Sequence, residues 1–302
     1  DNKPIDIRVS TFPTVLGENV VMRLLDASSE IFGLDEIGMQ ETDIAVFNAM
    51  IRKPYGIILV AGPTGSGKTT SLYSALSIIN SVDKNIITLE DPVEYHLNLI
   101  RQAQVNPKAD FTFASGLRAI LRQDPDVIMV GEIRDQETAK IAVEAALTGH
   151  LVLSTVHTND AIGTVIRLVE MGIERFLISS SLVGVVAQRL LRKICSKCKE
   201  EYVPPQESLQ EIGLEPSSVQ KFYRGTGCDN CFRSGYSGRI GIFEVLQITP
   251  ELAEGILKDL SNVELFQIAK KQGFHSLRED GIEKAMAGVT TIEEVLRVTK
   301  EF

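Results

Sequence analysis

Long apolar runs are missing from this sequence, and none approaches the roughly 20 residues that a membrane-spanning helix needs. A secretory signal peptide is also absent, and the first residue is Asp1 instead of Met, as expected of a fragment of a longer protein. No internal repeat or low-complexity tract is present. These absences predict a globular, cytoplasmic protein that does not cross a membrane by itself.

An excess of positive charge is also absent, since 40 acidic residues outnumber 31 lysines and arginines and give a formal net charge of −9. An acidic chain is a poor candidate for sequence-independent binding of nucleic acid, so we expect no nucleic-acid partner. The 302 residues are 44% hydrophobic and 24% charged, which is ordinary for a globular protein. This length allows two or three modules with a substantial core.

Cysteine is rare, and all four cysteines fall in two C-x-x-C pairs, Cys195 with Cys198 and Cys228 with Cys231. This usage indicates a reducing compartment and a metal site instead of a disulfide framework. Four thiolates favour tetrahedral Zn²⁺, and without an open coordination position the site is expected to be structural. The segment between the pairs exceeds the roughly 15–20 residues of the simplest zinc ribbon, so we expect a separate small lobe.

Apolar runs and helical segments alternate from residue 39 to residue 190. The expected strands cover 57–61, 86–89, 127–130 and 151–155. The expected helices cover 42–52, 67–80, 114–122 and 135–147. This alternation predicts an α/β fold with a parallel sheet that is covered by helices on both faces.

The rest of the chain differs from this pattern. Two alternating runs, 5–10 and 19–25, predict two strands, which need further strands to form a stable sheet. The tail carries helical periodicity and caps. We therefore divide the chain into the end of a β-rich domain (1–27), a linker (28–38), an α/β core (39–190), a tetracysteine lobe (191–240) and a helical C-terminal region (241–302).

The most specific motif is G-P-T-G-S-G-K-T at 62–69, directly after the apolar run 57–61. Small residues in this pattern let backbone N–H groups surround phosphate oxygens, while the lysine reaches the outer phosphates and the threonine hydroxyl ligates Mg²⁺. The start of the following helix adds a positive dipole. The motif predicts binding of a nucleoside triphosphate and Mg²⁺ by Gly62, Pro63, Thr64, Gly65, Ser66, Gly67, Lys68, Thr69 and Thr70.

Acidic side chains follow two of the expected strands, Glu90 after 86–89 and Glu132 after 127–130. Ligands of open α/β sheets bind beyond the carboxyl ends of the strands, where the glycine-rich loop also opens. A triphosphatase needs a carboxylate there to activate water and to help hold Mg²⁺. His157 follows the strand 151–155 on the same side, where it could sense the terminal phosphate.

Phosphoryl transfer often needs an arginine from the same subunit or a neighbour to neutralise charge in the transition state. The spacing singles out five arginines, none favoured over another by spacing alone: Arg8, Arg23, Arg118, Arg122 and Arg134.

Taken together, these residues resemble the secretion ATPase superfamily, in its type II secretion and type IV pilus assembly branch. The likeness covers nearly the whole chain. It includes the phosphate loop 62–69, an aspartate box at 87–94, a Walker B segment from 121–126 through 131–135, a histidine box at 148–150 and 155–158, and the tetracysteine lobe. The tetracysteine lobe points away from pilus-retraction ATPases, which generally lack it.

The resemblance implies a RecA-like core and assigns roles to several side chains. Glu132 matches the catalytic glutamate, and His157 matches a histidine implicated in coupling nucleotide state to movement. Arg8 and Arg23 match arginines that reach the nucleotide from the preceding domain. Three further positions match arginines around the phosphates or the subunit interface, Arg118, Arg122 and Arg134.

We therefore predict an ATP-hydrolysing motor that works as a homo-oligomeric ring, most simply a hexamer, peripheral to the inner membrane. The implied partners are an inner-membrane platform protein and a cytoplasmic docking protein. The implied catalytic set is Glu132, Glu90, Lys68, Arg8, Arg23 and His157. A nucleic-acid translocating ring ATPase is the alternative motor, and a nucleotide-binding module without turnover is the alternative to an enzyme.

Overall fold

A computed structural model of the chain describes residues 5–26, 31–212 and 221–300. The expected β segment 1–27, linker 28–38, lobe 191–240 and C-terminal region 241–302 each include residues outside this part. Among the described residues, no helix combines the length and apolarity that crossing a bilayer requires.

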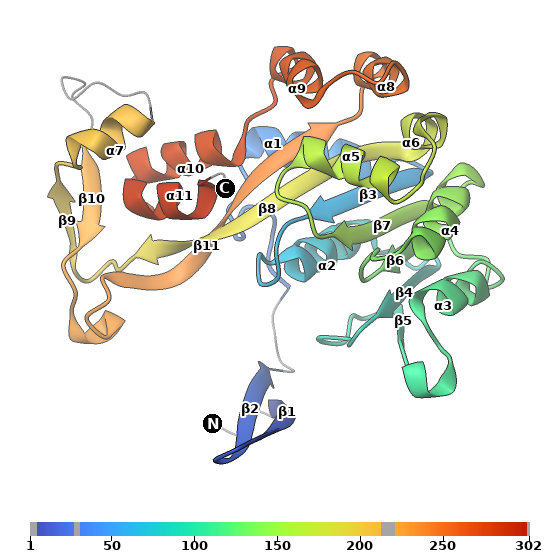
Figure 1. The fold of residues 1–302 in the computed structure, drawn as a ribbon, viewed down its shortest axis with the longest axis horizontal. Coiled ribbons are helices and arrows are strands. Elements are labelled where there is room, and N and C mark those ends of the chain that lie inside the picture. Colours follow the sequence, from blue (N-terminus) through green and yellow to red (C-terminus); the bar gives the residue numbers. More distant parts are fainter. Residues whose placement is uncertain (1–4, 27–30, 213–220, 301–302) are drawn as a thin grey trace.

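A seven-stranded sheet forms the centre of the molecule, in the order β11-β8-β3-β7-β6-β4-β5 (Figure 1). All neighbours pair in parallel except β11, which is antiparallel to β8. In sheet order the strands are Tyr236–Gln247, Leu182–Ile194, Gly56–Ala61, Leu151–Val156, Val127–Val130, Ile86–Glu90 and Arg101–Gln104. The predicted α/β fold is confirmed, and the four expected strands of the core are all present.

Helices cover both faces of this sheet, as the alternation predicted. On one face, a buried apolar cluster contains residues of the sheet and of two helices, α1 (Glu41–Ile51) and α2 (Lys68–Ile79). Six helices contribute to the cluster on the other face: α3 (Phe113–Ile120), α4 (Gln136–Leu147), α5 (Ala161–Glu170), α6 (Arg175–Ser181), α8 (Pro250–Leu257) and α9 (Asn262–Lys271). The sheet therefore lies between two apolar cores. In such a sheet, ligands bind beyond the carboxyl ends of the strands.

The cysteine lobe is carried on the ends of β8 and β11, which extend beyond the sheet (Figure 1). It contains the strand pair β9 (Lys199–Tyr202) and β10 (Phe222–Gly225) and the helix α7 (Gln206–Glu211). A third apolar cluster joins this lobe to α10 (Leu277–Met286) and α11 (Ile292–Thr299). The expected borders at 190/191 and 240/241 fall inside β8 and β11, because both strands run without a break from sheet to lobe.

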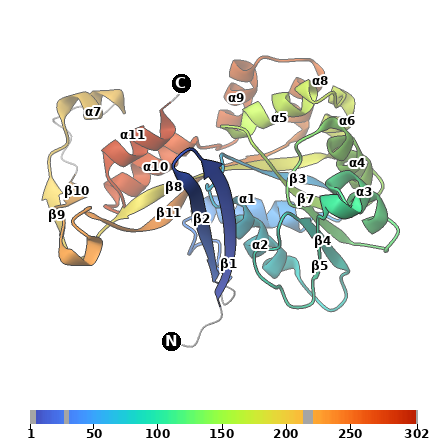
Figure 2. The ribbon, with the colours of Figure 1, turned by 60° about the horizontal axis from the view of Figure 1, so that its bottom comes forward.

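At the start of the described chain, β1 (Ile5–Thr14) and β2 (Gly17–Asp26) form an antiparallel hairpin. Figure 1 shows it below the sheet, and Figure 2 shows it in front of the middle of the molecule. The described part of the expected linker 28–38 packs against the core. Leu34 is 4% exposed and belongs to the apolar cluster around α1 and α2. Close packing of Gly38 against Ile240 also holds this segment to β11.

Candidate functional site

The loop 62–67 connects β3 to α2 in the geometry that the glycine motif requires. Gly62, Gly65 and Gly67 have φ angles of 147°, 79° and 90°, which side chains with a Cβ rarely adopt. A Cβ at Gly62 would lie 2.5 Å from the carbonyl oxygen of Gln188, so the loop also lacks space there. The motif therefore reflects both the backbone conformation and the tight packing of the loop.

The start of α2 has no side-chain cap, whereas the Asp135 carboxylate caps α4 by accepting a hydrogen bond from the Thr138 N–H. Uncapped backbone N–H groups at a helix start are free to bind an anion, and the helix dipole favours negative charge there. Ser66 has a buried hydroxyl oxygen with no hydrogen-bond partner among the described residues. The loop and helix start together form a cradle for phosphate.

Lys68 is the first residue of α2, and its ammonium lies over the loop. The Nζ atom donates to the carbonyl oxygens of Gly62 at 2.7 Å and Pro63 at 3.0 Å. Burial lowers the pKa of Lys68, and the negative charge of Glu132 opposes this effect. The cation is therefore held at the mouth of the cradle by two uncharged carbonyl oxygens, which negatively charged phosphate oxygens can replace.

A cavity of about 710 Å³ opens beside the loop. This volume is in the usual range of about 300–1,000 Å³ for small-molecule and cofactor sites. Thirteen of the residues singled out in the sequence line it: Arg8, Arg23, Thr64, Gly65, Ser66, Gly67, Lys68, Thr69, Thr70, Glu90, Glu132, Arg134 and His157.

Glu132 follows β6 and lies at the centre of a small charged group. Its Oε1 atom is 2.5 Å from Nη2 of Arg134, and its Oε2 atom is 3.4 Å from Nε2 of His157. The Glu132 side chain is only 12% exposed, whereas those of Arg134 and His157 are 66% and 44% exposed. A carboxylate in this position is suited to accept a proton from a water molecule in the cavity.

The arginines fall into two groups. Arg8 and Arg23 are directly opposite each other in the β1–β2 hairpin, and with Arg134 they line the cavity. Arg118 is paired with Glu137 at 2.7 Å on the surface, and Arg122 is exposed; neither lines the cavity of this chain. Their predicted role at the nucleotide or subunit interface stays a prediction.

Sequence reasoning missed several residues that line the cavity, among them Tyr95, Leu190 and Arg239. Leu190 and Arg239 come from β8 and β11, more than a hundred residues after the glycine-rich loop. No local motif marks them, and only the pairing of β8 with β3 brings this part of the chain to the loop.

The four cysteines form one cluster in which all sulfur atoms lie within 4.8 Å of one another. The sulfur atoms of Cys195 and Cys228 are 3.9 Å apart, those of Cys198 and Cys231 3.8 Å, and those of Cys228 and Cys231 3.7 Å. A tetrahedral ion with bonds of about 2.3 Å to sulfur requires sulfur atoms about 3.8 Å apart. The cluster therefore fits a tetrahedrally bound metal ion.

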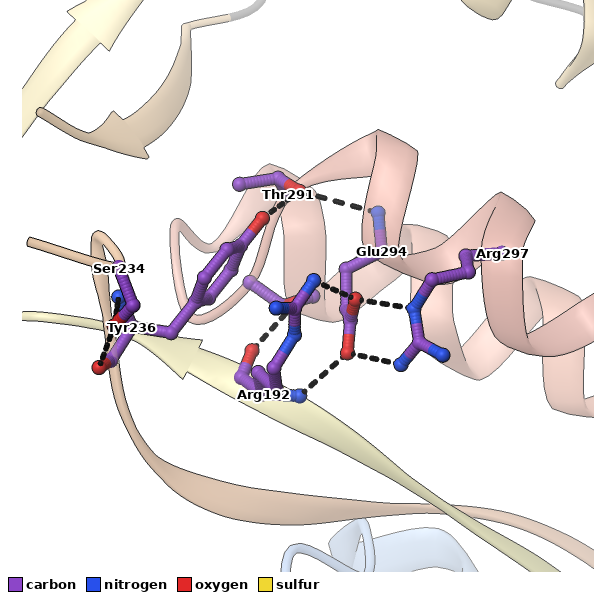
Figure 3. A network of polar contacts seen from close by, with 7 residues as sticks. Arg192, Ser234, Tyr236, Thr291, Glu294 and Arg297 are labelled. Atoms are coloured by element: carbon purple, nitrogen blue, oxygen red, sulfur yellow. Dashed lines mark hydrogen bonds and ion pairs between the residues drawn. The ribbon is translucent and has the colours of Figure 1, made fainter.

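The C-terminal helix is tied to the base of this lobe by an ion-pair network around the buried side chain of Glu294 (Figure 3). Glu294 accepts hydrogen bonds from Arg297 through Nε and Nη2, and from the backbone and side chain of Arg192. The Arg192 guanidinium stacks 4.1 Å from the ring centre of Tyr236, whose hydroxyl lies 2.9 Å from that of Thr291. The network joins α11 to β8 and β11 where these strands enter the lobe.

Comparison with known proteins gives one consistent set of relatives. The family model described as type II/IV secretion system protein matches residues 1–297. Type II secretion system protein E of Pseudomonas aeruginosa is 54% identical over 299 residues, which are 99% of this chain and 59% of that protein. Type IV pilus assembly ATPase PilB of Thermus thermophilus is 52% identical over 299 residues, 98% of this chain and 34% of that protein. This chain thus spans only part of the length of these relatives.

Solved structures give the same result for the fold. The pilus retraction motor PilT with bound ADP superposes with a TM-score of 0.70 at 28% identity, over 98% of this chain and 78% of that chain. The ATPase DotB of Yersinia pseudotuberculosis superposes with a TM-score of 0.72 at 22% identity, over 98% of this chain and 69% of that chain. At the latter identity the likeness concerns the fold alone.

Proposed function

Because this chain belongs to the type II/IV secretion system protein family, we propose that it is the ATP-hydrolysing motor part of a bacterial type II secretion or type IV pilus assembly machine. The observation that carries the proposal is a single cavity in which a glycine-rich phosphate cradle, two strand-end carboxylates and four arginines meet. These are the parts that phosphoryl transfer to water requires.

In the proposed reaction, the backbone N–H groups of the loop and the start of α2 bind the phosphates of ATP. The Lys68 ammonium exchanges the carbonyl oxygens of Gly62 and Pro63 for phosphate oxygens. Glu132 accepts the proton of the attacking water, and its contacts with Arg134 and His157 hold the carboxylate in place. Arg8, Arg23 and Arg134 neutralise the charge that develops on the phosphoryl group.

Two metal ions belong to this proposal. The Thr69 hydroxyl and, through water, Glu90 or Glu132 would hold Mg²⁺, which neutralises phosphate charge when bound. The four cysteine sulfurs would hold Zn²⁺, which stabilises the lobe when bound. The spacing of the sulfur atoms supports the second assignment.

The proposed working form is a homo-oligomeric ring, most simply a hexamer, in the cytoplasm at the inner membrane. The exposed positions of Arg118 and Arg122 leave their guanidinium groups accessible to a neighbouring copy. An inner-membrane platform protein and a cytoplasmic docking protein are the proposed partners. The net charge of −9 argues against the alternative of a nucleic-acid motor.

The test is phosphate release by the purified chain with ATP and Mg²⁺. Lys68→Ala removes the only lysine among the described residues that line the cavity, so we expect turnover to fall by about 10²–10³-fold, as for loss of one preorganised electrostatic partner. Lys53→Ala, which removes an exposed lysine after α1, is the matched control and should behave as the unmodified chain.

Normal hydrolysis by Lys68→Ala would refute the assignment of the site. The same assay with added duplex or single-stranded DNA tests the alternative motor. Stimulation that falls steeply as salt is raised would favour nucleic-acid translocation.

A further inference from the structure

Glu90 is surrounded by uncharged hydrogen-bond donors. Its Oε1 atom accepts from the Thr88 hydroxyl at 2.5 Å and from Nε2 of Gln102 at 3.1 Å. Its Oε2 atom accepts from the hydroxyl of Tyr73. Glu90 is 3% exposed and lines the cavity, so its carboxylate is at once buried and next to the proposed reaction.

These donors leave part of the Glu90 carboxylate without a hydrogen bond. A carboxylate has about four lone-pair positions, two on each oxygen. Thr88 and Gln102 occupy both positions on Oε1, and Tyr73 occupies one on Oε2. Among the described residues nothing else donates to Glu90, so one position of Oε2 remains for a water molecule in the cavity. Tyr73, as the other partner of Oε2, sets the direction of that position.

The donors themselves are fixed. Tyr73 is fully buried. Its burial and, as the second cause, its hydrogen bond to Glu90 raise the pKa of its hydroxyl, which therefore stays protonated and donates. The ring of Tyr95 packs edge-on against it, with centroids 4.6 Å apart. The amide of Gln102 accepts from the Leu97 N–H at 2.7 Å, so its NH₂ group is the end that faces Glu90.

We propose that Tyr73 and Gln102 are positioning residues that hold Glu90 for ATP hydrolysis, an inference that rests on the function proposed above. Tyr73 lies on α2, the helix whose first residue is Lys68. The helix therefore links the phosphate-binding ammonium and the water-orienting carboxylate through one rigid element. Gln102 on β5 fixes the same carboxylate from the edge of the sheet.

The simpler explanation is that Tyr73 is a core residue whose hydroxyl needs an acceptor. Phenylalanine would fill the same space, so Tyr73→Phe tests the hydroxyl alone. If Tyr73 acts through Glu90, kcat falls by about ten- to a hundredfold, the range expected for one hydrogen bond to a charged group. The KM for ATP and the binding of a fluorescent ADP analogue should change by less than about twofold, because no phosphate contact is lost.

The matched control is Tyr55→Phe, which removes the hydroxyl of an exposed tyrosine directly before β3, at the other end of the sheet from the loop. A second variant, Gln102→Glu, keeps the acceptor for the Leu97 N–H and replaces the donor to Glu90 by a negative oxygen. We expect it to lower kcat at least as much as Tyr73→Phe. Gln102→Glu decides the question if Tyr73→Phe does not fold, as judged by thermal unfolding.

The deciding measurement is a double-mutant cycle with Glu90→Gln. Residues that act as one unit give non-additive losses, so Tyr73→Phe should add almost nothing to the loss of kcat caused by Glu90→Gln. The inference would be overturned if the two losses of kcat multiplied in the double variant, or if kcat of Tyr73→Phe equalled that of Tyr55→Phe. An unmodified chain that releases no phosphate would instead overturn the proposed function, so the two failures are distinct.

Discussion

At the scale of single residues, Glu132 is distinguished from Glu90 by its partners. Glu132 touches two cationic or titratable side chains, Arg134 and His157, and keeps 12% exposure to the cavity. Glu90 is bound by three neutral donors, which fix the direction of its carboxylate. This difference assigns the proton-accepting role to Glu132 and the orienting role to Glu90 in the proposed reaction.

The assignment predicts that Glu132→Gln lowers kcat by about 10²–10⁴-fold, the usual contribution of a general base. Nucleotide binding should persist, because the cradle, Lys68 and Thr69 are unchanged. Phosphate release and equilibrium binding of a fluorescent nucleotide measure the two effects separately. Glu170→Gln, at an exposed pair with Arg167, is the control. Equal turnover in both variants would remove Glu132 from the mechanism.

The residues of the cavity differ in how far the sequence predicts them. The loop 62–69, Glu90 and Glu132 are predictable because each lies next to a buried strand that supplies its own local signal. Arg239 and Leu190 are not, because they reach the cavity only through the pairing of β8 with β3 and of β11 with β8. Motifs identify chemistry that is local in sequence, and the sheet adds the rest.

At the scale of elements, β8 and β11 explain the largest difference between expectation and structure. Each is 12 or 13 residues long, and its first or last half lies in the sheet while the remainder is partly exposed in the lobe. Such a strand has neither uniform burial nor a regular alternation along its whole length, which are the two patterns that reveal strands in a sequence. The expected borders at 190/191 and 240/241 therefore fall inside two strands that the sequence pattern does not reveal.

The Glu294 network predicts an acid-sensitive attachment of α11. Burial would raise the pKa of Glu294, but hydrogen bonds from Arg297 and Arg192 outweigh it and lower the pKa from 4.5 to about 2. Because the folded pKa is depressed, the stabilisation is present above pH 4.5 and is lost as the pH falls towards 2. Its size is about 3 kcal/mol at most, from 1.36 kcal/mol for each pKa unit.

Glu294→Gln should therefore reduce the free energy of unfolding at pH 7 by about 2–3 kcal/mol. The variant should also lose less stability than the unmodified chain between pH 4.5 and 2.5. Urea unfolding at several pH values measures both effects. Glu41→Gln, an exposed residue in the first turn of α1, is the control. Parallel stability curves for Glu294→Gln and the unmodified chain would contradict the role of the network.

For the lobe, we predict that Cys228→Ser abolishes zinc binding and unfolds β9 and β10. A structural zinc site supplies an apparent ~10–16 kcal/mol of folding free energy. The small apolar cluster that joins the lobe to α10 and α11 could not replace this stabilisation. The core should stay folded, because β8 and β11 are also held by β3 and by each other. Zinc content and thermal unfolding are the measurements. Ser196→Ala, between the two cysteines of the other C-x-x-C pair, is the control. Unchanged zinc content and stability in Cys228→Ser would disprove the site.

At the scale of the whole molecule, the β1–β2 hairpin is incomplete by itself. Ile7 is opposite Leu24 and Val9 opposite Met22, so these apolar side chains share one face, and each is 53–66% exposed. Two strands without a covered apolar face are at best marginally stable. On the opposite face, Arg8 and Arg23 are direct cross-strand neighbours, and like charges in that position repel. Both features support the proposal that contacts outside the described residues complete the hairpin.

A nucleotide phosphate in the cavity would relieve the repulsion between Arg8 and Arg23 and hold the hairpin against the core. We therefore predict that a non-hydrolysable ATP analogue with Mg²⁺ promotes assembly of the protein into a ring. For six copies of this 33.2 kDa chain, light scattering should give a mass of about 199 kDa. Arg8→Ala with Arg23→Ala should shift the analogue concentration needed for assembly upwards, since the anion then has fewer partners. A mass that stays at one copy at saturating analogue would count against the ring.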